Sequence, residues 1–61
     1  MEYKNFTGSV EFSEDDNLFF GKVLGIRALL SYEGSTLGDL EQAFRRVVDD
    51  YIAFSQNQAV D

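Results

Sequence analysis

The 61-residue chain has eleven acidic and five basic residues, neither cysteine nor histidine, and a formal net charge of −6. The lack of cysteine excludes disulfides, and the lack of both residues removes the commonest zinc ligands, thiol nucleophiles and imidazole bases. A chain this acidic is a poor match for a phosphate backbone and better suits a basic protein partner. We therefore predict a protein that is not an enzyme, uses no metal or cofactor, and binds no nucleic acid directly.

Residues 6–12 alternate between apolar or small side chains and polar ones. This alternation predicts a half-buried strand. The next five residues, Ser13 to Asn17, are polar and favour turns, so they are predicted to form a hairpin loop.

Residues 18–24 predict a second strand that is apolar on both faces. Phe19 and Val23 lie on one face, and Phe20 and Leu24 lie on the other. A strand of this kind is usually covered on both sides, so Phe20 and Leu24 are predicted to contact a second copy of the chain. Gly21 and Gly25 are expected to leave room for a close neighbour.

Residues 29–33 predict a third strand, and residues 36–54 predict an amphipathic helix. Thr36 suits the N-cap position, and Asp39 resembles the third-position acid of a capping box. The apolar arc of the helix spans roughly 180°, whereas about 100° serves a helix that rests on one surface. The flank with Val47 and Phe54 is therefore predicted to contribute to self-association.

The predicted architecture is α+β, a three-stranded antiparallel meander with one long amphipathic helix packed on one face, in the order β-β-β-α. Residues 1–54 form the domain, and residues 55–61 are predicted to be a flexible tail. A domain of this size without disulfides often gains stability by self-association, so a homodimer is expected. The start of the chain lacks the apolar core of a signal peptide, which favours a cytoplasmic protein.

The acidic residues give two candidate groups for contacts with a basic partner. Glu14, Asp15 and Asp16 are consecutive in the predicted loop, and Asp49 and Asp50 adjoin on the predicted helix. A solvated loop is the commoner role for such a cluster. A further alternative is a magnesium-dependent ribonuclease that uses Asp16, Asp49 or other acids, but consecutive acids point apart and do not readily share an ion.

Four blocks of the sequence together resemble the amino-terminal domain of HicB-like antitoxins. They are Y-K-N-F-T-G-S-V-E-F at 3–12, F-F-G-K-V-L-G-I at 19–26, L-L-S-Y-E-G-S-T at 29–36 and L-E-Q-A-F-R-R-V-V-D-D-Y-I at 40–52. The agreement lies in the order and wording of all four blocks, which cover nearly the whole chain.

The resemblance implies a pared-down ribonuclease H fold without catalytic carboxylates. It also implies a partner, HicA, a small basic ribonuclease that cleaves messenger RNA and that this domain would bind and mask. Many family members add a carboxyl-terminal DNA-binding domain, and the sequence ends at Asp61 before that part, so operator binding is not carried over. The alternative is a solitary structural or regulatory homodimer with no toxin partner.

Overall fold

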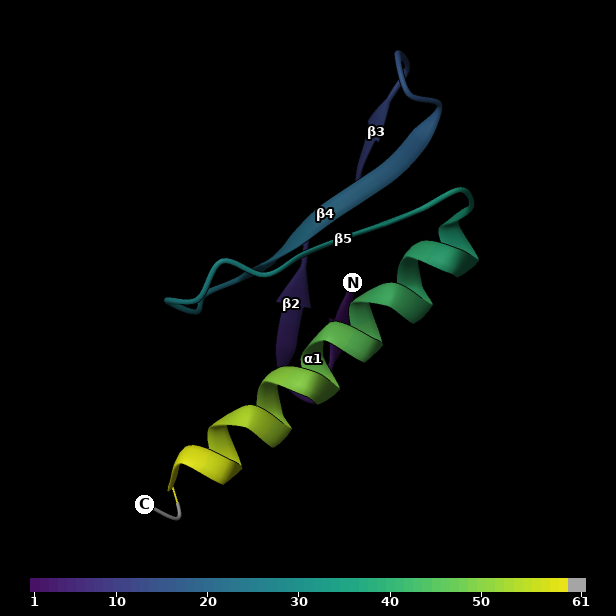
Figure 1. Ribbon diagram of the computed structural model, residues 1–61. Helices are drawn as coiled ribbons and strands as arrows, with labels where there is room; N and C mark the ends of the chain where they lie inside the picture. Colours follow the sequence, from purple (N-terminus) through teal and green to yellow (C-terminus); the bar gives the residue numbers. More distant parts are fainter. Residues whose placement is uncertain (60–61) are drawn as a thin grey trace.

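The computed structural model describes the backbone of residues 1–59 and the side chains of residues 1–55. It has an antiparallel five-stranded sheet and one long helix that packs against one face of the sheet (Figure 1). The predicted α+β class is therefore confirmed. The elements are β1 (Glu2–Tyr3), β2 (Phe6–Gly8), β3 (Glu11–Ser13), β4 (Leu18–Leu24), β5 (Ser31–Gly34) and α1 (Leu37–Ala59).

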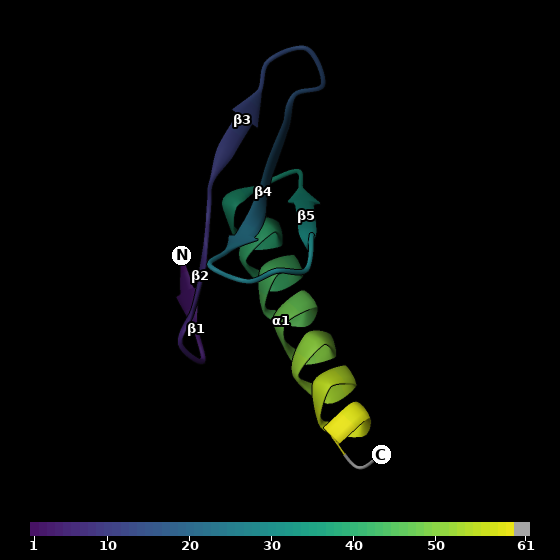
Figure 2. The same ribbon diagram turned by 90° about the vertical axis from the view of Figure 1, so that its left-hand side faces the viewer.

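Strand β4 lies at the centre of the sheet and has the predicted bounds. It pairs with β2 and β3 along one edge and with β5 along the other, while β1 pairs with the outer side of β2 (Figure 2). In the β4–β5 pair Gly21 lies opposite Tyr32, and in the β3–β4 pair Phe12 lies opposite Phe19. All of the neighbouring strands are antiparallel, as hairpin connections require.

The sheet has five strands where the sequence predicts three. One reason is that the predicted strand 6–12 is interrupted between β2 and β3. The Ser9 N–H donates to the Lys22 carbonyl at 3.0 Å, but the Ser9 carbonyl accepts the Tyr32 hydroxyl at 2.8 Å instead of a partner strand. The other reason is β1, a two-residue strand that enters β2 through Lys4 and Asn5, both at positive φ.

Helix α1 begins where the sequence predicts. The Asp39 N–H donates to Thr36 Oγ1 at 3.1 Å, and the Leu40 N–H donates to the Thr36 carbonyl at 2.9 Å, so Thr36 is the N-cap. The predicted end at Phe54 is wrong, because the helix continues to Ala59. Residues 55–59 contain neither glycine nor proline that would stop it. Of the predicted tail, residues 60 and 61 lie outside the described residues.

The core lies between the helix and the helix-facing side of the sheet. Leu40, Phe44 and Val48 on α1 are at most 1% exposed, and they pack against Val23 and Tyr32 at 6% each. The Tyr32 and Phe44 rings are 5.2 Å apart between centroids. Val23 and Tyr32 are therefore the buried apolar side chains of β4 and β5 on the helix-facing side of the sheet.

Two glycines let the sheet approach this core. A Cβ atom at Gly21 would collide with the Ser9 carbonyl oxygen, and one at Gly8 would lie 2.7 Å from a ring carbon of Phe44. The predicted close approach is therefore confirmed at Gly21. It is wrong for Gly25, which has no neighbour within 4 Å and instead has a φ of +76° in the turn after β4.

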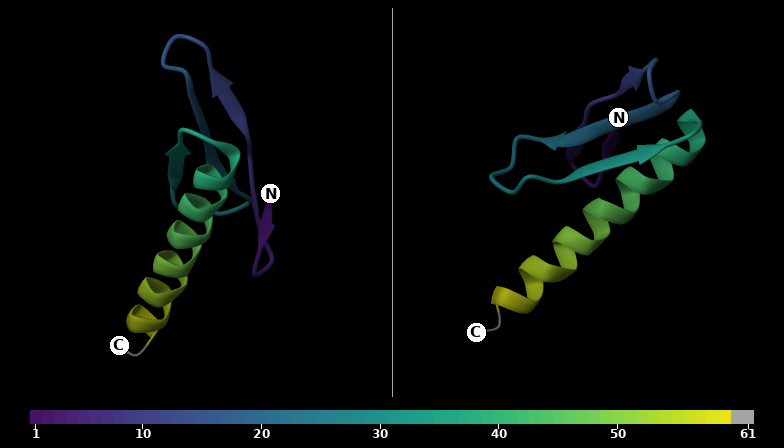
Figure 3. Two further views of the ribbon diagram at one scale, coloured as in Figure 1. Left: turned by 90° about the vertical axis from the view of Figure 1, so that its right-hand side faces the viewer. Right: turned by 45° about the horizontal axis from the view of Figure 1, so that its top comes forward.

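The two layers separate at both ends of the molecule. The β3–β4 hairpin rises away from the start of α1, and the carboxyl-terminal half of α1 extends away from the connection between β4 and β5 (Figures 1 and 3). The helix therefore contacts the sheet from Leu40 in its first turn to about Ile52, and the apolar side chains of Leu37 and Phe54 outside this range are exposed.

Candidate interaction surfaces

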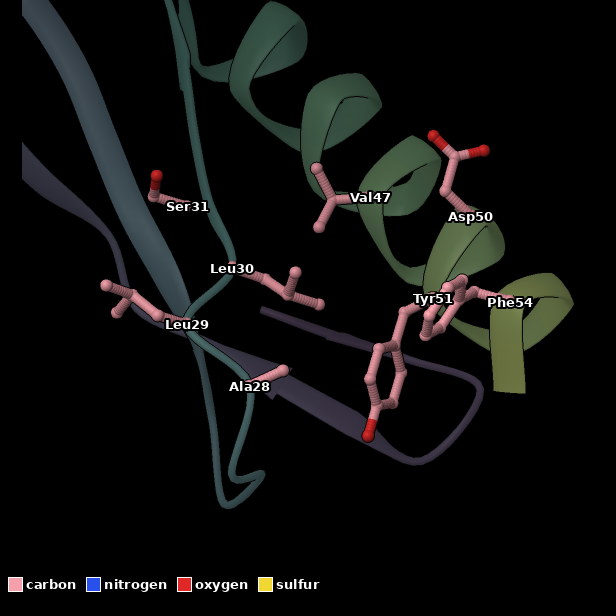
Figure 4. A pocket seen from close by; sticks show the side chains of 8 residues that line it. All are labelled: Ala28, Leu29, Leu30, Ser31, Val47, Asp50, Tyr51 and Phe54. Carbon is pink, nitrogen blue, oxygen red and sulfur yellow. The ribbon is translucent and has the colours of Figure 1, made fainter. Parts of the chain in front are cut away.

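An apolar groove lies where the carboxyl-terminal half of α1 separates from the sheet. It has a volume of about 520 Å³ and is open to solvent. Leu30, Val47 and Tyr51 point toward one another across it, whereas Leu29 and Ser31 point to the other side of the strand (Figure 4). We call it the helix-flank groove, lined by Ala28, Leu29, Leu30, Ser31, Val47, Asp50, Tyr51 and Phe54.

The groove contains two of the residues that the sequence predicts for self-association. Val47 is half-buried, and Phe54 is 58% exposed although it lies on the apolar side of the helix. Leu29, at 87%, is the most exposed large apolar side chain among the described residues, and the sequence analysis did not single it out. The sequence feature that indicates its exposure is the Leu29–Leu30 pair, because two adjacent residues of an extended segment point in opposite directions and only one of them can face the helix.

The other two residues predicted for self-association lie on a different surface. Phe20 and Leu24 are 38% and 43% exposed on the face of the sheet away from the helix, with Lys22 between them. Glu11 and Glu33 lie opposite Phe20 on the two neighbouring strands. The four predicted residues are therefore divided between an outer sheet face and the helix-flank groove.

The acidic turn lies at the far end of the β3–β4 hairpin. Glu14, Asp15 and Asp16 are exposed, and the Asp16 N–H donates to Ser13 Oγ at 3.4 Å within the turn. Residues 9–20 contain four acidic side chains and no basic one. This part of the molecule is consequently the most one-sided in charge within the described residues.

Exposed apolar side chains accompany the acids of the hairpin. Val10 and Phe12 are each 46% exposed, and the Phe12 ring lies 4.8 Å from that of Phe19 between centroids. We refer to the acidic turn with Val10 and Phe12 as the hairpin surface. Sequence reasoning missed its apolar part because the alternation of residues 6–12 placed both side chains on the buried face. Val10 also borders a hollow of about 310 Å³ that is lined by Met1, Leu37, Gly38 and Glu41.

The two predicted acids on the helix do not join the acids of the hairpin. Asp49 accepts hydrogen bonds from Lys4 Nζ at 2.9 Å and from the Tyr3 hydroxyl at 3.3 Å, which ties the β1–β2 turn to α1. The hydrogen bond from Lys4 holds the pKa of Asp49 below its ordinary value, and the same bond raises the pKa of Lys4. Asp50 lies at the rim of the helix-flank groove with its carboxylate directed away from Leu30 (Figure 4).

The carboxylates suggested for a magnesium-dependent ribonuclease lie apart. Asp16 belongs to the hairpin turn, while Asp49 is engaged with Lys4 at the opposite end of β2 and β3. Among residues 1–55 no three acidic side chains are grouped closely enough to hold a metal ion.

The same part of the chain contains no helix that is both long and apolar enough to cross a membrane.

Tyr32 is the one core residue with a polar group near these surfaces. Burial raises the pKa of its hydroxyl, which donates to the Ser9 carbonyl between β2 and β3. The hydroxyl is therefore held in a structural hydrogen bond at the interruption between β2 and β3.

Comparison of the chain with protein-family models, with curated proteins and with solved structures finds no match.

Proposed function

We propose that this chain is a HicB-like protein-binding module that masks a small, basic, HicA-like ribonuclease. The observation that carries the proposal is the hairpin surface, where exposed Val10 and Phe12 lie beside an acidic turn with no basic residue between positions 9 and 20. An apolar patch rimmed by charge of one sign is typical of a surface that binds a protein of the opposite charge.

The two parts of this surface contribute differently to binding. The carboxylates of Glu14, Asp15 and Asp16 would accelerate the encounter with a cationic protein and select against acidic ones. The buried contact area would come mainly from Phe12, since aromatic side chains near the centre of an interface dominate its free energy. A ribonuclease that must bind RNA carries a basic surface, which an acidic partner of this kind would cover.

The proposal includes the family fold, a pared-down ribonuclease H sheet with one helix. It is supported by the central position of β4, with β2 and β3 on one side and β5 on the other. Masking would not require catalytic groups on this chain, and the cytoplasm, where messenger RNA is cleaved, is the location that goes with it. Operator binding is not part of the proposal.

The test is binding to any small basic protein that a gene neighbouring the gene of this chain encodes. Isothermal titration should detect a complex at micromolar concentration that weakens as salt rises, because part of the attraction is Coulombic. Replacing Glu14, Asp15 and Asp16 together by lysine should reduce the association rate strongly, whereas Glu2→Lys, which changes an exposed carboxylate on β1 outside these surfaces, should reduce it less. The absence of any complex at micromolar concentration would contradict the proposal.

A second candidate function is a solitary structural or regulatory homodimer. It is favoured by the outer sheet face, where Phe20 and Leu24 are exposed although both belong to the central strand. Sedimentation would then show a tight dimer of the wild-type chain, and Leu24→Asp would dissociate it. A wild-type chain that sediments as a monomer at high micromolar concentration would reject this candidate.

A further inference from the structure

The outer edge of β5 has backbone groups without partners in the described part of the chain. β5 pairs only with β4, and no described element lies beyond its other side (Figures 1 and 2). The Val23 N–H donates to the Leu30 carbonyl at 3.0 Å, so Leu30 bonds inward toward β4. Bonding direction alternates along an antiparallel strand. The N–H and C=O groups of Ser31 and Glu33 therefore point outward.

The helix-flank groove lies directly below this edge. Tyr32 is buried against the helix, and Leu30 points across the groove toward Val47 (Figure 4). In an added strand, the residues opposite Leu30 and Tyr32 would point to the same face as they do. The inward side chains at the Leu30 end of such a strand would thus enter the apolar groove beside Tyr51 and Phe54.

The outer face beside this edge has an exposed acid, Glu33, on the edge strand itself. Glu33 lies across Phe20 from Glu11, and Lys22 lies on the same face opposite Ser31, one strand further in. Opposite charges directly across a strand pair are stabilising, and like charges are destabilising. An added strand with a lysine or arginine opposite Glu33 would consequently be preferred.

We propose that the β5 edge and the helix-flank groove form one site, which binds an extended segment of a basic protein as a sixth strand, antiparallel to β5. Its side chains alternate, with apolar residues in the groove and at least one cation on the outer face. Main-chain hydrogen bonds to Ser31 and Glu33 hold the segment, and the groove selects it. The inference deepens the proposed function, on which it rests for the charge of the partner.

A second copy of the whole domain fits this edge less well than a single strand does. In Figure 2 the carboxyl-terminal half of α1 extends past β5 on the open side. A two-fold related copy joined through β5 would bring its own helix toward the same space below the sheet. An extended segment brings no helix and needs only the edge and the groove.

The probe is an acetylated nine-residue peptide in which valine alternates with threonine, with one central lysine in place of a threonine. Titration followed by amide chemical shifts should move the Ser31 and Glu33 signals of the intact chain. Methylating the backbone nitrogens of the threonines and the lysine should weaken binding about tenfold or more, since these are the N–H groups that face β5. Methylating the valine nitrogens, which face away, should leave binding within about twofold.

Two variants and a matched control locate the site. Ser31→Pro removes an outward N–H that the sheet does not use, and Phe54→Asp places a charge at an exposed position of the groove. Each should weaken peptide binding about tenfold. Phe12→Asp makes the same change at an exposed phenylalanine of the hairpin and should leave it unchanged. Circular dichroism shows whether each variant is folded. If the Ser31→Pro variant is unfolded, Phe54→Asp still tests the site.

Three results would overturn the inference. The first is equal affinity of the two methylated peptides for the chain. The second is that the peptide changes amide chemical shifts only at residues 14–16. The third is that the chain without peptide is a dimer whose Ser31 and Glu33 amides are protected from hydrogen exchange. The inference and the proposed function can fail separately. If lysine substitution of the acidic turn abolishes binding of a basic protein, but the Ser31→Pro variant binds that protein normally, only the inference is rejected. Peptide binding without any complex with the basic protein rejects only the function.

Discussion

Phe44 and Phe54 are ten positions apart on one helix, and their environments are opposite. Phe44 is 1% exposed and contacts Tyr32 in the core, whereas Phe54 is 58% exposed at the margin of a groove. Both belong to the same apolar side of α1. The difference arises because the helix separates from the sheet in its carboxyl-terminal half. The apolar side of a helix thus shows which residues are suited to burial, either within the domain or against a partner. The length of the sheet decides which of these residues the domain itself buries.

The largest effect is expected for Phe44→Ala. Truncating a buried aromatic side chain should lower the free energy of unfolding by about 3–5 kcal/mol, a large part of the stability of so small a domain. Phe54→Ala is the matched control and should change it by less than about 0.5 kcal/mol. Urea denaturation of both variants checks the comparison. Equal losses would mean that Phe54 is covered in solution and that the two ends of the helix do not differ in this way.

A smaller effect is expected for Gly21→Ala. The added Cβ would press on the Ser9 carbonyl, and overpacking of this kind costs about 1–3 kcal/mol. Gly38→Ala in the first turn of α1 is the control, because its nearest neighbour is Thr36 Oγ1 at 3.8 Å. We expect an unchanged or raised melting temperature there, since alanine favours helix. A Gly21→Ala variant as stable as wild type would show that the sheet can shift away from the core.

Removing the helix cap should cost less. Thr36→Ala deletes the acceptor of the Asp39 N–H and should lower the free energy of unfolding by about 1 kcal/mol. Ser35→Ala, one residue earlier and outside the cap, should have almost no effect. Because the cap lies at the packed end of α1, hydrogen exchange should speed up in the first turn and not near Phe54. Uniform acceleration along the helix would indicate that α1 opens as one unit.

The smallest effect is expected at the exposed Lys4–Asp49 pair. The folded-state pKa of Asp49 is lowered, so its contribution is present above its unfolded pKa and fades as pH falls through the folded value, below about pH 4. The pKa of Lys4 is raised, so its contribution fades only at strongly alkaline pH. Melting temperatures of wild type and Asp49→Asn should therefore differ slightly at neutral pH and converge in acid. A difference that does not change with pH would mean that the pair contributes no charge-dependent stability.

How far the sequence predicts this molecule depends on whether a feature is local. The second strand and the N-cap at Thr36 followed from periodicity and capping chemistry, both of which act over a few residues. The break at Ser9 did not, because it depends on the hydroxyl of Tyr32, more than twenty positions later. The end of the helix was placed too early, because loss of apolar periodicity does not stop a helix that lacks a breaker.

The candidate surfaces show the same limit. Val47 and Phe54 were predicted as exposed apolar positions, since the width of the helical arc can be read from the sequence. Val10 and Phe12 were not, because an alternating pattern shows that two residues share a face and not whether the helix extends far enough to cover it. Leu29 was missed for a related reason, since its exposure depends on the path of the connection before β5.

The Tyr32 hydroxyl lies against both Gly8 and Gly21, so three positions on three different strands form one steric unit. A shorter side chain at position 32 would relieve only part of this restriction, because a Cβ atom at Gly21 would still meet the Ser9 carbonyl and one at Gly8 would still meet the Phe44 ring. Deep mutational scanning should therefore find that position 21 stays glycine whatever residue stands at 32. Alanine at position 8 should be tolerated only when residues 32 and 44 are both smaller.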